Sequence, residues 1–367
     1  MDDSDIKPAK SFKARAALSN PDGRFESLRH CAFDDGWATG DAHDGDDGTP
    51  ASETLTRVLI EDKARSLISY NTSPDVPHDR SINPYRGCEH GCIYCFARPT
   101  HGYLGLSSGL DFETQLFYKP QAASLLKQEL AQPAYRCAPV ALGINTDAYQ
   151  PVERELRITR QILEVLLACR HPVVVITKSV LLERDIDLLT EMAQGNLVQV
   201  VISLTSLDRR LIKNMEPRAC PPQRRLEMIH RLSEANIPVG VLIAPIIPVL
   251  TDHELETLLQ QSYAAGARSA GYVLLRMPHE IKDLFYQWLE RHYPLKANHI
   301  RTRMRDCHGG EDYVAEFGQR MRGTGAYAEL IAQRFRTASR RLGFQPAALL
   351  DSTQFTQTPA TGQLNLF

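Results

Sequence analysis

The chain has 367 residues, which is enough for one large domain or two ordinary ones. Hydrophobic residues make up 43% and charged residues 23%, an ordinary globular composition that can bury a sizeable core. The formal net charge of −2 argues against a simple polybasic nucleic-acid binder, although it leaves room for a local basic groove. The eight cysteines are too few and too scattered for a disulfide scaffold.

The sequence predicts neither a signal peptide nor a membrane span. Its N-terminus is polar and acidic, unlike a secretory signal. The most apolar stretch, residues 237–250, contains three prolines and is shorter than the roughly 20 residues that a span needs. We therefore expect a soluble, cytoplasmic protein with no membrane partner.

The first 50 residues differ in charge from the rest of the chain. They hold 11 acidic and 6 basic residues, a net of −5, whereas the other 317 residues carry a net of +3. Residues 34–48 are rich in Asp and Gly and contain one large apolar residue, Trp37. Such a segment buries too little apolar surface to offset its ordering entropy. We expect residues 1–50 to form a disordered acidic leader and residues 51–78 an extension before the core.

Beyond residue 80, short β-branched runs alternate with amphipathic stretches. Strands are predicted over residues 140–144, 173–177, 197–204, 238–244 and 270–275, with a first strand just before Gly87. Helices are predicted at about 121–131, 154–169, 183–194, 222–235 and 253–265. This alternation favours parallel strands with right-handed crossovers. The expected fold is α/β, a partial (β/α)6 barrel over residues 79–300, with its chemistry at the carboxyl ends of the strands.

The C-terminal part is predicted to be helical and basic. Arginines gather between residues 301 and 341, so we expect a basic helical extension over residues 301–346. These arginines are candidates for phosphate contacts, although an arginine-rich helix surface is often only solvated. Residues 347–367 carry one charged residue, Asp351, and are predicted to be a flexible tail.

The strongest motif is a triplet of cysteines, Cys88, Cys92 and Cys95, just before the βα units. The spacing lets a short loop present three thiolates to one face of an iron–sulfur cubane. Zinc is the alternative, with His90 or His101 as the fourth ligand. Structural zinc sites usually carry paired CxxC motifs, so the triplet favours an iron–sulfur cluster.

This motif, with Tyr94 before its last cysteine, resembles the signature of the radical S-adenosylmethionine (SAM) superfamily. The resemblance covers roughly residues 80–300. It implies that Cys88, Cys92 and Cys95 hold a [4Fe–4S] cluster whose open iron binds SAM, and that Tyr94 lines the adenine side. It also implies cleavage of SAM to a 5′-deoxyadenosyl radical that abstracts hydrogen, with electrons from a donor such as flavodoxin or ferredoxin.

Motifs at the predicted strand ends resemble the spore photoproduct lyase branch, which contains DNA repair lyases. The resemblance implies that Thr146 and Asp147 help to bind SAM, that Lys178 pairs with its carboxylate and that Ser203 contacts its ribose. Arg276 is the last strand-end candidate. For Thr146 and Asp147 the alternative is an N-cap of the next helix, and for Lys178 it is a solvated charge. The tripeptide 216–218, Glu-Pro-Arg, recurs in the branch and is expected to order the loop over the site.

One position departs from this branch. Spore photoproduct lyases have a hydrogen-donating cysteine where this chain has Ile144, and Cys137 lies several residues upstream. We therefore expect a different substrate or hydrogen donor. The predicted reaction is hydrogen abstraction on damaged or modified DNA or RNA. The alternatives are a tRNA- or protein-modifying radical SAM enzyme, or a non-catalytic, clamp-associated iron–sulfur or zinc protein that binds DNA.

The last five residues also resemble a known motif. Gln363, Leu364, Leu366 and Phe367 have the pattern of the peptide by which bacterial proteins bind the sliding clamp. Such a peptide places apolar anchors in a groove of its partner, and a flexible tail gives it reach. The alternative is an ordinary terminus whose Leu and Phe side chains fold back on the core.

Overall fold

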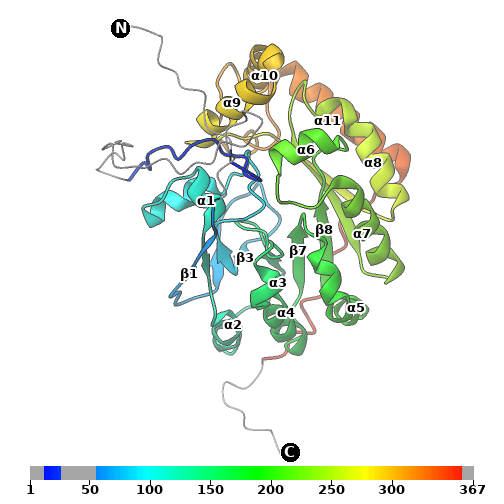
Figure 1. The fold of residues 1–367 in the computed structure, drawn as a ribbon. Coiled ribbons are helices and arrows are strands. Elements are labelled where there is room, and N and C mark those ends of the chain that lie inside the picture. The colour runs from blue at the N-terminus through cyan, green and yellow to red at the C-terminus, as the bar shows by residue number, and fades with distance from the viewer. Residues whose placement is uncertain (1–11, 26–54, 358–367) are drawn as a thin grey trace, which may run out of the picture.

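The computed structural model describes residues 12–25 and 55–357 (Figure 1). A seven-stranded sheet forms its centre, in the order β10-β9-β8-β7-β6-β3-β2. Neighbouring strands are parallel except for β2, which is antiparallel to β3. The strands are β2 (Ile68–Tyr70), β3 (Arg80–Ile82), β6 (Val140–Leu142), β7 (Val173–Thr177), β8 (Val198–Ser203), β9 (Val239–Ile246) and β10 (Ser269–Leu274). The predicted α/β class with a parallel sheet is confirmed.

Crossover helices cover the outside of the curved sheet (Figure 1). They are α2 (Ala122–Leu130), α4 (Ile158–Ala168), α5 (Ile186–Gln194), α7 (Pro222–Glu234) and α8 (Leu255–Ala264). In α4 the buried Ile158, Ile162 and Leu166 recur every fourth residue and so lie on one face. We predicted one helix over 154–169, whereas α3 (Glu153–Leu156) is separated from α4 by Arg157, whose φ of 52° breaks the helix.

The strand predicted just before Gly87 lies in a different sheet. The first parallel strand of the large sheet is β3, whereas β4 (Tyr85–Arg86) pairs with β5 (Gln115–Tyr118) in a three-stranded sheet of order β1-β5-β4. Strand β1 spans Val58–Glu61. The segment between β4 and β5 contains the three cysteines, the 3₁₀ helix η1 (Arg98–Leu104) and α1 (Leu110–Thr114). The cysteines therefore lie on an excursion from this small sheet.

The predicted helical extension is confirmed, although it is interrupted. Helices α9 (Ile281–His292), α10 (Pro294–Asp306) and α11 (Gly325–Leu342) follow β10. Residues 307–324 contain no helix. The remaining short helices are η2 (Val180–Asp185), α6 (Arg209–Met215) and η3 (Asp252–Glu254). No helix among the described residues is both long and apolar enough to cross a membrane.

A pair of ionic side chains joins the two edges of the large sheet. Arg320 donates from Nε to Oδ2 of Asp75 at 2.5 Å, and the N–H of Gly318 donates to the other carboxylate oxygen at 2.7 Å. Asp75 lies in the loop after the edge strand β2. Beside Arg320, the carbonyl of Met321 accepts a hydrogen bond from Leu274 of the opposite edge strand, β10. We call Asp75, Gly318 and Arg320 the clasp.

Parts of both predicted disordered ends pack against the domain. Residues 12–25, dark blue in Figure 1, lie beside α1, with Ala16 and Ala17 buried. At the other end, the N–H groups of Asp351 and Thr356 donate to the carbonyls of Asn196 and Cys169 at 3.0 and 2.9 Å. The prediction of disorder is therefore wrong for residues 12–25, and that of a flexible tail is wrong for residues 347–357. Other parts of these ends lie outside the described residues.

Candidate functional site

The cysteine loop, residues 87–95, lies over the carboxyl ends of the parallel strands. The hydroxyl of Thr146, after β6, donates to the carbonyl of Gly87 at 2.8 Å. The amide oxygen of Gln150 accepts from the N–H of Glu89 at 2.8 Å. The carbonyl of Met215, at the end of α6, accepts from Ile93 at 3.0 Å. The loop is thus fastened to the edge where parallel α/β proteins place their chemistry.

Cys88 and Cys92 are buried, Cys95 is partly buried, and the three thiols are close enough to influence one another. Burial, followed by the nearby charges of Asp147 and the other two cysteines, holds the pKa of Cys88 well above its usual range. Burial is also the main cause that raises the pKa of Cys92 and Cys95, against the opposing charge of Lys178. A bound cation would favour the ionised form of these thiols. This donor set fits a cluster that takes one thiolate on each of three irons.

The two histidines considered as zinc ligands already make contacts through one ring nitrogen each. Among the described residues, no group of three His, Cys, Asp or Glu side chains could hold a single metal ion. His90 points its Nδ1 at the carboxylate of Asp147, 3.3 Å away, and Nε2 of His101 bonds the carbonyl of Gln115 at 3.0 Å. Each histidine thus has a partner on one ring nitrogen, while Nδ1 of His101 is buried without a partner among the residues that the structure describes.

Thr146 and Asp147 hold protein groups, whereas we expected them to contact SAM. The hydroxyl of Thr146 bonds Gly87 as described above and accepts from Gln150 at 3.1 Å. One oxygen of Asp147 accepts from the Thr177 hydroxyl at 2.7 Å, and the other accepts from the N–H of Lys178 at 2.8 Å. Burial alone would raise the pKa of Asp147, but His90 and these hydrogen bonds lower it to about 2.

Lys178 and Ser203 lie together above adjacent strands. Nζ of Lys178, just after β7, donates to Oγ of Ser203, at the end of β8, at 2.5 Å. The same ammonium is 5.8 Å from the centre of the Tyr94 ring. The ammonium is therefore placed between the cysteine loop and the sheet, where it can accept an anionic ligand as a point charge.

Tyr94 belongs to a buried polar network. Its hydroxyl bonds Glu216 and lies 3.1 Å from the Thr205 hydroxyl, while Arg225 forms a fully buried ion pair with Glu216. Burial would raise the pKa of Glu216, but the charges of Arg225 and Lys178 lower it to about 2. Glu216, from the 216–218 motif, thus fixes the aromatic ring beside the cysteines.

Arg276 follows β10 and has an unsatisfied donor. Its Nε is buried without a hydrogen-bond partner, and its guanidinium stacks on the exposed ring of Phe96 at 4.4 Å. Burial lowers the pKa of Arg276, and its charge in turn acts on Cys95. A buried donor with no protein partner beside the cysteine loop is suited to a polar ligand.

The 216–218 motif was expected to order the loop, and its Arg218 bonds Glu89 there; several other residues that hold the loop were not predicted. Glu89, fully buried, pairs with Arg57 at 3.2 Å and with Arg218 at 2.6 Å. Arg98 and Glu113 form a second buried ion pair at 2.5 Å. The available sequence signal was the presence of charged residues within an apolar, cysteine-bearing segment. Charged residues in such a segment are normally buried only as ion pairs.

Cys137 lies before β6, at the opposite end of this strand from the candidate site. It precedes that strand, whereas the site residues Thr146 and Asp147 follow it. The strand therefore places Cys137 at its amino end and Ile144 at its carboxyl end. The cysteine does not replace the thiol that Ile144 lacks.

Most arginines of the basic extension have carboxylate partners. Arg301 pairs with Glu290, and Arg305 pairs with Asp312. By contrast, Arg336 and Arg340 on α11 are exposed, and no ion pair to them occurs within the described residues. Only a part of the predicted basic surface is thus free to meet phosphates.

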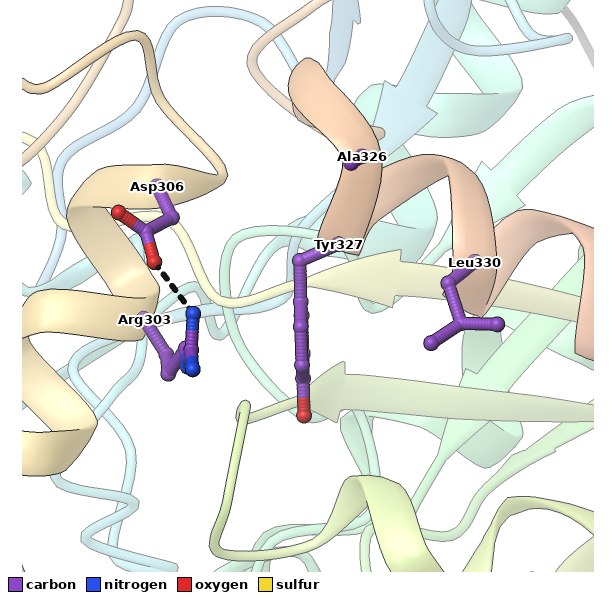
Figure 2. A pocket seen from close by; sticks show the side chains of 5 residues that line it. All are labelled: Arg303, Asp306, Ala326, Tyr327 and Leu330. Carbon is purple, nitrogen blue, oxygen red and sulfur yellow. Dashed lines mark hydrogen bonds and ion pairs between the residues drawn. The ribbon is translucent and has the colours of Figure 1, made fainter.

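A cavity of about 310 Å³ lies between α10 and α11, away from the cysteine loop (Figure 2). It is lined by Arg303, Asp306, Ala326, Tyr327 and Leu330. Arg303 pairs with Asp306 at 2.9 Å, and the Tyr327 hydroxyl donates to Asp252 at 2.5 Å. These polar groups satisfy one another, and the cavity shares no lining residue with the candidate site.

Comparison with known proteins agrees with this arrangement. Residues 82–261 match the family model described as the radical SAM superfamily. An uncharacterized protein of Mycobacterium tuberculosis (strain ATCC 25618 / H37Rv) is 39% identical over 228 residues, which cover 62% of this chain and 67% of that protein. An uncharacterized protein of Methanocaldococcus jannaschii is 28% identical over 196 residues, 53% of this chain and 70% of that protein.

Solved structures of spore photoproduct lyase share the fold. The one complexed with dinucleoside spore photoproduct has a TM-score of 0.55 at 17% identity, over 79% of this chain and 80% of that chain. A mutant with bound AdoMet and the same dinucleoside gives 0.53 at 16% identity, with equal coverage. With the family match and the cysteine motif, the chain belongs to the radical SAM superfamily, enzymes that use a [4Fe–4S] cluster and S-adenosylmethionine.

Proposed function

We propose that Cys88, Cys92 and Cys95 hold the [4Fe–4S] cluster of a radical SAM enzyme that abstracts hydrogen from a nucleic-acid substrate. The observation that carries this proposal is the position of the three thiols, two buried and one partly buried, over the carboxyl ends of the parallel strands. A cluster bound there supplies an open iron for SAM and the electron that cleaves it to a 5′-deoxyadenosyl radical.

The side chains around the loop divide into two roles. Lys178, Ser203 and Arg276 present polar groups beside the thiols, so we assign them to SAM, with Lys178 as the partner of its carboxylate. Tyr94 would face the adenine, with its ring fixed by Glu216. Thr146 and Asp147 would act as positioning residues, because their side chains already hold Gly87 and the end of β7.

Anaerobic reconstitution tests the assignment. The purified protein should bind iron and sulfide, show visible charge-transfer absorbance, and form 5′-deoxyadenosine when dithionite and SAM are added. Cys92→Ala should lose the cluster, whereas Cys220→Ala, a partly buried cysteine outside the loop, should retain it. Zinc in place of iron, or full iron content in Cys92→Ala, would contradict the ligand assignment.

The substrate proposal rests on the fold shared with a lyase whose structures hold a dinucleoside photoproduct. Because Ile144 provides no thiol, we propose a reaction other than the dimer reversal of that lyase. Deuterium transfer into 5′-deoxyadenosine should be compared on labelled DNA with damaged or modified bases, on tRNA and on peptides. Transfer from nucleic acid alone supports the proposal, and transfer from peptide alone refutes it.

The C-terminal residues Gln363–Phe367 are proposed to bind the sliding clamp, on the basis of their sequence pattern; they lie outside the described residues. The full-length protein should capture purified clamp in a pull-down. Deleting Gln363–Phe367 should abolish capture without changing 5′-deoxyadenosine formation. Equal capture by both forms, or by neither, would remove this partner.

A further inference from the structure

One buried guanidinium fixes the backbone of the cysteine loop. Arg98 is fully buried three residues after Cys95. It donates from Nε to the carbonyl of Cys92 at 2.8 Å and from Nη2 to the carbonyl of Gly91 at 2.9 Å. Its Nη1 bonds the carbonyls of Ser108 and Gly109 at 3.0 and 2.9 Å. The planar fork of arginine makes all four contacts from one side chain.

Glu113 neutralises this arginine and shapes the loop. Its Oε1 accepts from Nη2 of Arg98 at 2.5 Å, and neither side chain is exposed. A buried guanidinium without this carboxylate would be strongly unfavourable. Glu113 also lies directly against Gly91, where a Cβ would come within 2.7 Å of Oε2. Because Gly91 has φ of 65° as well, both space and backbone conformation require glycine between the first two cysteines.

The N-terminal segment completes this arrangement. We call residues 12–22 the strap. The N–H groups of Ala16 and Ala17 donate to Oε2 and Oε1 of Glu113 at 3.2 and 3.0 Å. Nη1 of Arg15 donates to the Glu113 carbonyl at 2.8 Å. The two alanines also lie in the same buried apolar cluster as Cys92. The carboxylate thus joins the strap to the arginine that holds the loop.

We infer that Arg98, Glu113 and the strap form a second layer of the cluster site, in which the two charged residues position the cysteine loop and the strap seals it. This inference rests on the proposed function of Cys88, Cys92 and Cys95. The carboxylate accepts from one guanidinium and two backbone N–H groups, so removing the strap takes away two of these three hydrogen bonds and leaves only that from Arg98. Removing its charge leaves the cation of Arg98 uncompensated beside the loop.

Four variants of the full chain test the inference. Glu113→Gln keeps the side-chain shape and removes the charge, and deletion of residues 1–22 removes the strap. Their matched controls are Glu256→Gln, which loses an ion pair with Arg334 between α8 and α11, and deletion of residues 1–11. Each protein is reconstituted anaerobically. Iron and sulfide content, the rate of iron release to a chelator, the thermal midpoint and the cluster's reduction midpoint by EPR titration are measured.

Both test variants should release iron faster than the wild type, by on the order of 10-fold to 100-fold, as expected for lost outer-sphere contacts of a metal site. Glu113→Gln should also raise the reduction midpoint, because an uncompensated cation favours the reduced cluster. Both controls should match the wild type. Unchanged iron release and midpoint in both test variants would overturn the inference. Failure of the wild type to load a cluster would instead refute the proposed function.

Discussion

The phenolic hydroxyl of Tyr94 donates a hydrogen bond to the carboxylate of Glu216, 122 residues further along the chain. That carboxylate also accepts from Thr205 at 2.7 Å and pairs with the buried Arg225. The network links the cysteine loop to the end of β8 and to α7. Because Arg225 and Glu216 are buried and neutralise each other, substitutions that remove one of these two charges should be the least tolerated.

Glu216→Ala should destabilise the protein more than Tyr94→Phe. Removing the carboxylate leaves Arg225 buried and unpaired, which costs about 3–5 kcal/mol. Removing only the hydroxyl loses a hydrogen bond to a charged group, about 2 kcal/mol. Urea unfolding measures both values. Equal losses would show that the arginine finds another partner.

Lys178→Met should weaken SAM binding without reducing cluster content. The thioether keeps much of the side-chain length but loses the charge that we assign to the SAM carboxylate. A charge-assisted hydrogen bond of about 1.5–3 kcal/mol corresponds to a loss of about 10-fold or more in affinity. Titration of the reconstituted protein with SAM, followed by EPR, gives the dissociation constant. The exposed Lys213 on α6 provides a control, and an equal effect of Lys213→Met would refute the assignment.

Exchange of Arg336 and Arg340 for Gln should weaken binding to duplex DNA. These exposed side chains lie one helical turn apart on α11 and have no carboxylate partner in the described part of the chain. Loss of two phosphate contacts should reduce the slope of log K against log salt by about 2. Fluorescence anisotropy at several salt concentrations measures this slope. Arg301→Gln, which breaks an ion pair with Glu290, should leave it unchanged. An unchanged slope in the double variant would exclude this surface.

His171 should make the fold sensitive to mild acid. Burial lowers its pKa from 6.5 to about 4, and its ring bonds the Tyr135 hydroxyl at 2.7 Å and the Pro172 carbonyl at 2.9 Å. Because the folded state resists protonation, stability is complete above about pH 6.5 and falls as the pH drops toward 4, by up to about 3 kcal/mol.

His101, whose pKa burial also lowers to about 4, should contribute a similar amount. His171→Gln should therefore reduce the loss between pH 6.5 and 4, as measured by urea unfolding at several pH values. The exposed His230 provides the control, because His230→Gln should follow the wild-type curve. If the unfolding free energy of His171→Gln falls with pH as steeply as that of the wild type, the prediction is contradicted.

Asp75→Asn should loosen both edges of the sheet. The substitution removes the charge that holds Arg320, while the amide oxygen can still accept from Gly318. We expect faster hydrogen exchange in residues 71–78 and 316–323, with little change elsewhere. The exposed Asp283 serves as the control in the same experiment. Unchanged exchange in both segments would show that the clasp contributes nothing to their order.

The parallel strands β6 to β9 could be predicted because each is a short, mostly apolar run that is largely buried, whereas β3, Arg-Ser-Ile, lacks this pattern and was missed. The prediction for residues 173–177 matches β7, and that for residues 222–235 ends one residue beyond α7. The short strands β1 and β2 were missed because their burial is uneven and carries no clear periodicity. Their positions depend on partners distant in the sequence.

The cysteine motif identified the candidate site, but its supporting contacts were not visible in the sequence. Arg98 pairs with Glu113, 15 residues further along the chain, and the N–H of Ala16 donates to the same carboxylate from 97 residues away. The strap was predicted to be disordered because its composition was averaged with that of the acidic residues after it. Two buried alanines, their backbone N–H groups and the side chain of Arg15 help to dock it, and composition does not report such contacts.

The excursion that carries the cysteines leaves and rejoins the fold at neighbouring points, since Tyr85 of β4 lies opposite Tyr118 of β5. Insertions or deletions between these strands therefore need not disturb the register of the large sheet. Residues 87–114 form a cassette whose two ends are held together by the pairing of β4 with β5. Exchanging the cassette with that of a relative would replace the cysteine loop, while the carboxyl ends of the parallel strands stay in place.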